Sequence, residues 1–206
     1  MIKTKKFNTA ILIIAFLIVC NSSWGQTYAQ NGMAVSDNEI ASQVGIDILK
    51  KGGNAIDAAI ATAFALEVTH PQAGNIGGGG FLVFMNVKGE VTTIDFREKA
   101  PLLAKSDMFL DEKGNLVEGS NHSGLKSVGV PGTVAGLYLA HQKYGSLSWK
   151  ELVQPSVDLA DKGVRLSFTL AQHANNFFSK SDEDFMKNYF TNSKGELLKF
   201  DDLWVQ

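Results

Sequence analysis

Four consecutive glycines, Gly77 to Gly80, lie between a predicted helix and a predicted strand, and this order constrains the fold. A nucleotide-binding glycine loop instead follows a strand and opens a helix, so that the phosphate meets the helix N-terminus. No Gly-Lys-Ser or Gly-Lys-Thr follows the run either. The sequence therefore argues against a phosphate-binding loop. Two interpretations remain: the glycines let the chain turn where other residues would clash, or they let the backbone closely approach a packed element or a ligand.

Two helices are predicted before the glycines. The first begins at Ser36-Asp37-Asn38-Glu39, which fits a capping box, and ends at Gly52-Gly53. Its expected apolar face contains Ile40, Val44, Ile48 and Leu49. Asn54 is expected to cap the second helix, which runs from Ala55 to about Val68. Its many alanines make this helix narrow, so we expect it to be buried among close neighbours.

A β-hairpin is predicted directly after the glycines. The residues from Phe81 to Val87 form a continuous apolar strand, and Lys88-Gly89 forms a turn. The partner strand runs from Val91 to Arg97. Because side chains alternate along a strand, Ile94 and Phe96 point to one side, and Thr93, Asp95 and Arg97 point to the other.

The second half of the chain is predicted to be mainly helical. Residues 102 to 128 are polar and turn-rich, as in a surface excursion. A helix follows from about Gly132 to Tyr144, with small residues at Gly132, Gly136 and Ala140 that favour close packing. Ser148 and Glu151 fit a second capping box, which opens a helix that contains Pro155 and ends near Gly163. From Ser179 onward the sequence turns polar.

The first 25 residues fit a secretory signal peptide. Lys3, Lys5 and Lys6 precede an apolar run from Ala10 to Cys20, which is shorter than the roughly 20 residues of a membrane-spanning helix. Cleavage is expected after Gly25 or Ala29. A buried core helix is the alternative for the apolar run, and lipid attachment at Cys20 is disfavoured because Val19 is not small. We therefore expect residues 26–206 to be exported, with no membrane contact after signal removal.

The candidate chemistry centres on Arg97. An arginine at a strand end is either a surface or ion-paired residue, with Asp95 and Glu98 as available partners, or a two-pronged binder of a carboxylate. The four histidines, His70, His122, His141 and His173, show no metal-ligand spacing, and no catalytic triad can be assembled. The net charge is −2 and no basic stripe is present, which argues against nucleic acid as a partner. No motif implies a metal or an organic cofactor.

Several long motifs resemble gamma-glutamyltranspeptidase (glutathione hydrolase), in particular the N-terminal part of its large subunit. The stretches that carry the resemblance are "GMAVSDNEIASQVGIDILKKGGNAIDAAIATAFALEVTHPQAGNIGGGGF", "IDFREKAP", "DMFLDEKGN", "GVPGTVAGLYLAHQKYG" and "VQPSVDLADKGVRLS". They cover most of the chain from Gly32 to Ser167.

The resemblance implies an α/β (α+β) fold of the N-terminal-nucleophile hydrolase type, an αββα four-layer sandwich. Residues 26–206 would form only an N-terminal portion of it, incomplete at the C-terminus. In this family a precursor, or zymogen, cuts itself before a threonine, which becomes the nucleophile of the small subunit. The enzyme transfers the γ-glutamyl group of glutathione and other γ-glutamyl compounds to water or amino acids.

Little of that catalytic machinery is expected in this chain. The resemblance assigns the substrate α-carboxylate to Arg97, and Glu98 is expected to set the surroundings of that arginine. No catalytic residue is expected, since the nucleophilic threonine would lie beyond Gln206, in a small subunit from the same precursor. The alternatives are a related glutaryl or cephalosporin acylase and an inert truncated fragment. The expected compartment is outside the cytoplasm, in a bacterial periplasm.

Overall fold

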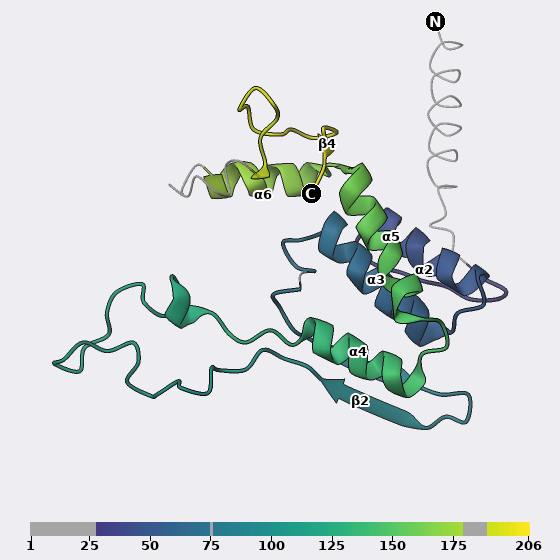
Figure 1. Ribbon diagram of the computed structural model, residues 1–206, viewed down its shortest axis with the longest axis horizontal. Helices are drawn as coiled ribbons and strands as arrows, with labels where there is room; N and C mark the ends of the chain where they lie inside the picture. The colour runs from purple at the N-terminus through teal and green to yellow at the C-terminus, as the bar shows by residue number, and fades with distance from the viewer. Residues whose placement is uncertain (1–27, 75, 179–188) are drawn as a thin grey trace, which may run out of the picture. The chain divides into compact units, whose positions relative to one another are not determined.

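The computed structural model describes residues 28–74, 76–178 and 189–206. The chain divides into two units, Met1–Gly32 and Met33–Gln206. The described elements all belong to the second unit (Figure 1). The predicted signal peptide and residues 179–188 of the polar segment that begins at Ser179 lie outside the described residues.

Helix α2 (Glu39–Lys50) is capped by Asn38, not by Ser36 as the sequence predicted. The Asn38 side chain accepts hydrogen bonds from the backbone N–H groups of Ile40 and Ala41. Ser36 lies two residues too early to reach those groups, and its hydroxyl contacts the Ser42 hydroxyl 2.8 Å away. The capping-box prediction at this end was therefore wrong, although the helix itself is confirmed.

The predicted apolar face of α2 is confirmed at Ile48, which is buried, and at Val44 and Leu49, which pack against the core, but not at Ile40. Ala41, Gly45 and Ile48 are buried, whereas Ile40 is 37% exposed. A Cβ atom on Gly45 would overlap the Thr62 hydroxyl, so the small residue lets α2 approach the next helix closely. At the other end Gly52 has a φ of 92°, a left-handed conformation that ends the helix as predicted.

Helix α3 (Ala55–Thr69) is the central helix of the second unit and is buried along most of its length. It contacts α2, α4 (Thr133–Tyr144) and α5 (Trp149–Lys162), as Figure 1 shows. Asn54 caps it, and the Asp57 carboxylate accepts a hydrogen bond from the Asn54 backbone N–H. Phe64 meets Trp149 edge to face with ring centroids 5.4 Å apart. The prediction of a narrow buried helix is confirmed.

The predicted hairpin is confirmed, with shorter strands than expected. Strand β1 (Phe81–Met85) pairs antiparallel with β2 (Val91–Asp95), and Leu82 lies opposite Ile94. Gly89 has a φ of 81° in the turn. One face, with Leu82, Phe84, Ile94 and Phe96, is buried or half-buried. The other face is exposed although it is apolar: Phe81, Val83, Met85 and Val91 are each at least 64% exposed.

Residues 102 to 128 form turns, one short 3-10 helix η1 (Leu125–Ser127) and an isolated bridge between Leu110 and Leu116, which confirms the predicted surface excursion. Helices α4 and α5 follow as predicted. Ser148 and Glu151 form the reciprocal capping box of α5, Pro155 lies inside that helix, and Gly163 ends it with a φ of 81°.

A second hydrophobic cluster follows α5, and the sequence did not predict its pairing. Strand β3 (Val164–Arg165) pairs antiparallel with β4 (Leu203–Trp204), close to helix α6 (Phe168–Phe178) in Figure 1. Trp204 is 3% exposed and stacks on Phe190 with ring centroids 4.6 Å apart. The Trp204 indole N–H donates a hydrogen bond to the Tyr189 carbonyl at 3.0 Å.

Candidate functional site

Arg97 lies just after β2, at the exposed end of the hairpin. Its Nε donates a hydrogen bond to Glu98 Oε2 at 3.1 Å, and its Cζ lies 5.8 Å from the centroid of the Phe81 ring. Asp95 instead accepts a hydrogen bond from the Arg97 backbone N–H. The two terminal nitrogens of the guanidinium have no partner among the described residues, and the side chain is 61% exposed. The outer edge of the guanidinium is therefore free to bind a planar anion.

Glu98 is suited to hold Arg97 because its carboxylate stays ionised. A hydrogen bond from its own backbone N–H, together with the hydrogen bond from Arg97, lowers the pKa of Glu98. The backbone N–H of Gly79 also contributes to the lower pKa. An anionic Glu98 fixes the Nε side of the guanidinium and leaves the other side for a ligand.

The glycine run packs directly against the backbone around Arg97. A Cβ atom on Gly79 would lie 2.6 Å from the Phe96 carbonyl oxygen and 2.9 Å from Arg97 Cα. The Gly78 carbonyl accepts hydrogen bonds from the backbone N–H groups of Gly132 and Thr133, at the start of α4. The run thus joins β1, the Arg97 segment and α4, and close backbone packing explains the glycine at position 79.

A shallow cavity of about 260 Å³ lies next to the arginine. Its lining includes Arg97, Phe96, Lys99, Pro131 and Gly136. Lys99 and Val130 exchange backbone hydrogen bonds, which ties the segment after Arg97 to the residues that precede α4. The charged residues that line the cavity are Arg97, Lys99 and Asp95, so two basic side chains face one acidic side chain there.

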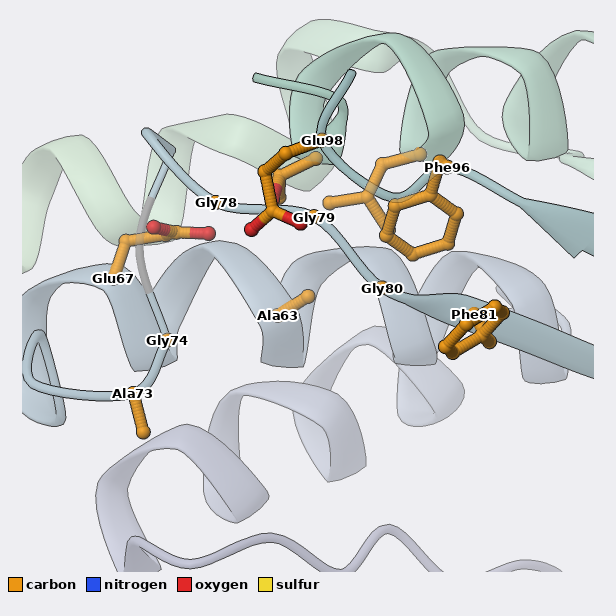
Figure 2. A pocket seen from close by; sticks show the side chains of 12 residues that line it. Ala63, Glu67, Ala73, Gly74, Gly78, Gly79, Gly80, Phe81, Phe96 and Glu98 are labelled. Atoms are coloured by element: carbon orange, nitrogen blue, oxygen red, sulfur yellow. The ribbon is translucent and has the colours of Figure 1, made fainter. Parts of the chain in front are cut away.

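A second cavity of about 240 Å³ lies along the glycine run (Figure 2). Glu67, from α3, and Glu98 both line it together with Gly78, Gly79 and Gly80. Glu67 Oε2 is buried and has no hydrogen-bond partner among the described residues. Glu67 was not predicted as a site residue; the signal was a second carboxylate, after Asp57, within a mainly apolar, alanine-rich helix.

Burial raises the pKa of Glu67 to about 7. Since the folded-state pKa lies above the unfolded value, the folded protein binds more protons, and its stability falls as the pH rises from about 4.5 through about 7. We expect Glu67→Gln to raise stability at pH 8 by about 1 kcal/mol, which is a few degrees in Tm. The gain should vanish near pH 4.5, where Glu67 is protonated in the folded state.

Thermal unfolding of the two proteins at a series of pH values measures this effect. Glu112→Gln is the matched control, because Glu112 is exposed in the surface excursion. A gain for Glu67→Gln that stayed constant across the pH range would contradict a titrating Glu67.

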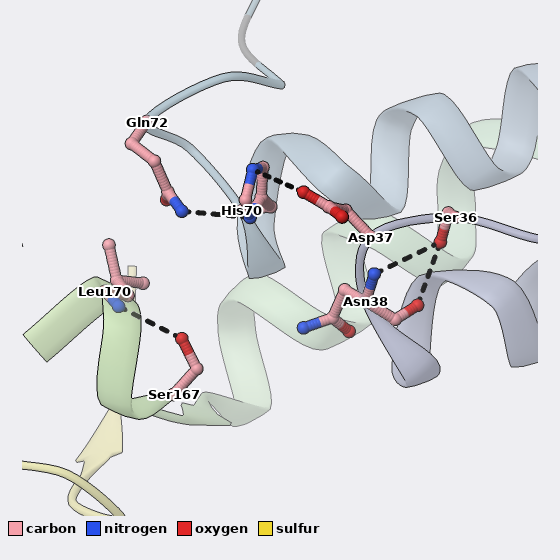
Figure 3. A network of polar contacts seen from close by, with 7 residues as sticks. All are labelled: Ser36, Asp37, Asn38, His70, Gln72, Ser167 and Leu170. Carbon is pink, nitrogen blue, oxygen red and sulfur yellow. Dashed lines mark hydrogen bonds and ion pairs between the residues drawn. The ribbon is translucent and has the colours of Figure 1, made fainter.

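Two of the four histidines, His70 and His141, make contacts within the fold. His70 Nε2 lies 3.3 Å from Asp37 Oδ2, and its Nδ1 lies 2.9 Å from Gln72 Nε2 (Figure 3). His141 Nε2 lies 2.8 Å from the Leu147 carbonyl oxygen. Within residues 28–74, 76–178 and 189–206, no cluster of three or more His, Cys, Asp or Glu side chains could hold a metal ion. None of the helices in these ranges has the length and apolarity needed to cross a membrane.

The sequence profile described as Gamma-glutamyltranspeptidase matches residues 41–206. The chain belongs to the gamma-glutamyltranspeptidase family. A glutathione hydrolase proenzyme of Pseudomonas sp. (strain A14) is 45% identical over 190 residues, which cover 90% of this chain and 32% of that protein. The chain therefore spans about a third of the length of this relative.

Solved structures confirm the α/β fold class of the family. The crystal structure of Helicobacter pylori gamma-glutamyltranspeptidase matches 88% of this chain and 52% of that chain, with a TM-score of 0.83 and 42% identity. A cephalosporin acylase from Bacillus halodurans matches 90% of this chain and 36% of that chain, with a TM-score of 0.68 and 28% identity. The chain forms a portion of the N-terminal-nucleophile hydrolase fold that the resemblance implied.

Proposed function

We propose that this chain is the N-terminal part of the large subunit of a secreted γ-glutamyltransferase and glutathione hydrolase, in which Arg97 binds the α-carboxylate of the γ-glutamyl substrate. The observation that carries the proposal is the geometry of Arg97: Glu98 holds its Nε, and its outer nitrogens have no partner in the described part of the chain. Family membership supports the reaction class, and the proenzyme name of the relative supports processing into subunits.

The role of Arg97 in this reaction is binding and orientation. A free α-carboxylate is planar and anionic, so two guanidinium nitrogens bind it with two parallel hydrogen bonds. Holding that end of glutathione, or of another γ-glutamyl compound, places the γ-carbonyl at a fixed distance from the arginine. The threonine that attacks this carbonyl lies beyond Gln206, in the small subunit, and the acyl group then passes to water or an amino acid.

The proposal predicts a large effect of Arg97→Ala on substrate binding. In the complete protein the KM for glutathione should rise about tenfold or more, because an ion pair with two hydrogen bonds is lost, while kcat should change less. Arg97→Lys should recover only part of the affinity, since an ammonium group lacks the planar fork.

Steady-state kinetics with glutathione measures both variants. Lys88→Ala is the control, because it removes a positive charge from the exposed turn of the same hairpin without touching Arg97. An unchanged KM for glutathione in Arg97→Ala would remove the proposed role.

A second candidate activity is hydrolysis of glutaryl amides, which the likeness to a cephalosporin acylase favours. A glutaryl group also ends in a carboxylate, so Arg97 alone does not separate the two activities. Turnover of glutathione and of a glutaryl amide by the complete protein, measured side by side, decides between them. A reading frame that stopped at Gln206, in a protein that turned over neither substrate, would favour the inert fragment instead.

The signal-peptide pattern of residues 1–25 supports export of residues 26–206, with a bacterial periplasm as the proposed compartment. Mass spectrometry of the protein recovered from the periplasmic fraction would identify the mature N-terminus. Cleavage after Gly25 or Ala29 is the expected result.

A further inference from the structure

Phe96, the residue before Arg97, has its ring enclosed between two glycines. A Cβ atom on Gly80 would lie 3.0 Å from Phe96 Cε2, at one edge of the ring. A Cβ atom on Gly136, in α4, would overlap Phe96 Cβ, Cγ and Cδ1. We call this enclosure, formed by Gly80 and Gly136, the Phe96 slot.

The overlap at Gly136 includes the Cβ atom of Phe96, and this limits how the protein can accommodate a side chain at position 136. The position of Cβ is fixed by the backbone, so rotating the Phe96 side chain cannot move it. An added methyl group on Gly136 therefore has to push away either the backbone at Phe96, directly after β2, or helix α4.

The backbone of Phe96 is held on its other sides. Its N–H donates to the Gly80 carbonyl at 3.0 Å, and its carbonyl accepts from the Gly80 N–H at 3.4 Å. Gly79 packs on the Phe96 carbonyl and on Arg97 Cα. A displacement of Phe96 is consequently passed to Arg97 through the chain.

We propose that Phe96, seated in the Phe96 slot, is a positioning residue that fixes the backbone of Arg97 and thereby sets the affinity of the site for a substrate α-carboxylate. This inference rests on the proposed function of Arg97. It adds that the distance between α4 and the Arg97 segment, set by the absence of a side chain at Gly136, determines how well the guanidinium is placed. A misplacement of a binding group by about 1 Å can lower the activity of an enzyme by about a hundredfold.

The test measures competitive inhibition of the complete protein by L-glutamate, which carries the α-carboxylate, and by its α-amide, which does not. Gly136→Ala should raise the inhibition constant for L-glutamate about tenfold, with kcat lowered by less than about threefold. The inhibition constant for the α-amide should change less than about twofold, because the arginine gains little from an uncharged group.

Two further variants separate positioning from loss of stability. Leu166→Ala removes a side chain that is 1% exposed from the second hydrophobic cluster, which does not include Phe96, so it should lower Tm without changing the inhibition constant for L-glutamate. Phe96→Ala, which adds no atoms, should raise the inhibition constant for L-glutamate about threefold. In the double variant Phe96→Ala with Gly136→Ala, that inhibition constant should rise by less than the product of the two single increases.

The outcomes also distinguish this inference from the proposal on which it rests. If Arg97→Ala raises the inhibition constant for L-glutamate while Gly136→Ala and Phe96→Ala do not, the positioning role is overturned and the function of Arg97 stands. If Arg97→Ala itself has no effect, the proposed function fails, and the inference fails with it. An equal weakening of L-glutamate and α-amide binding in Gly136→Ala would also overturn the positioning role.

Discussion

Replacing Asp57 with alanine is expected to lower the free energy of unfolding by about 3 kcal/mol or more at pH 7. Asp57 is 0% exposed and lies at the start of α3. Its carboxylate accepts hydrogen bonds from the backbone N–H groups of Asn54, Ser146 and Leu147, and from the Ser146 hydroxyl. Alanine would leave these donors unsatisfied and would detach the turn between α4 and α5 from α3.

The pH dependence gives this prediction a sharper form. Burial alone would raise the pKa of Asp57, but the hydrogen bonds from Ser146, Asn54 and Leu147 together lower it below its ordinary value of 3.8. The stabilisation is therefore present above pH 3.8 and is lost as the pH falls through the folded-state pKa.

Chemical unfolding of the complete protein at pH 7 and at lower pH measures the Asp57 effect. Asp107→Ala is the control, because Asp107 is exposed in the surface excursion, and it should change stability by less than about 0.5 kcal/mol. An Asp57→Ala variant as stable as the control would contradict the structural role assigned to these hydrogen bonds.

The second large effect is expected at Trp204. Replacing Trp204 with alanine should lower the free energy of unfolding by about 3 kcal/mol or more. The substitution removes the stacked contact with Phe190 and the hydrogen bond to the Tyr189 carbonyl. Because Trp204 lies opposite Val164 in the β3–β4 pair, we expect the loss to open this second cluster before the helices around α3.

Hydrogen exchange followed by mass spectrometry locates the Trp204 effect. Protection should fall in β3, in β4 and at the C-terminal end of α3 around Val68, which belongs to the same cluster, and should stay high in the rest of α3. Val205→Ala is the neighbouring control, since Val205 is 56% exposed. Equal loss of protection throughout α3 would show that the two clusters unfold as one unit.

The sequence predicted well those elements whose signals are local. The alanine-rich helix α3, the hairpin with its Gly89 turn and the Ser148–Glu151 capping box all depend on residues within a few positions of one another. The error at the start of α2 arose because Ser36 and Asn38 are both good capping residues. Only the backbone conformation decides which of them reaches the free N–H groups.

The features that sequence reasoning missed depend on long-range contacts. The β3–β4 pair joins two residues on each side across a large separation in the chain, which leaves no periodic pattern to detect. The buried oxygen of Glu67 depends on how α3 meets the glycine run. At Arg97 the sequence left Asp95 and Glu98 open as partners, and the structure assigns the guanidinium to Glu98 and the backbone N–H to Asp95.

The glycines around Arg97 differ in whether a substitution at each of them can be compensated by a second substitution elsewhere. At Gly136 an added methyl group meets a side chain, so a second change, at Phe96, can relieve part of the damage. At Gly79 and Gly132 the methyl group meets the backbone of Phe96 and Arg97, which every residue type shares. No side-chain change elsewhere can compensate for a substitution at these two positions, so only reversion to glycine would restore the site.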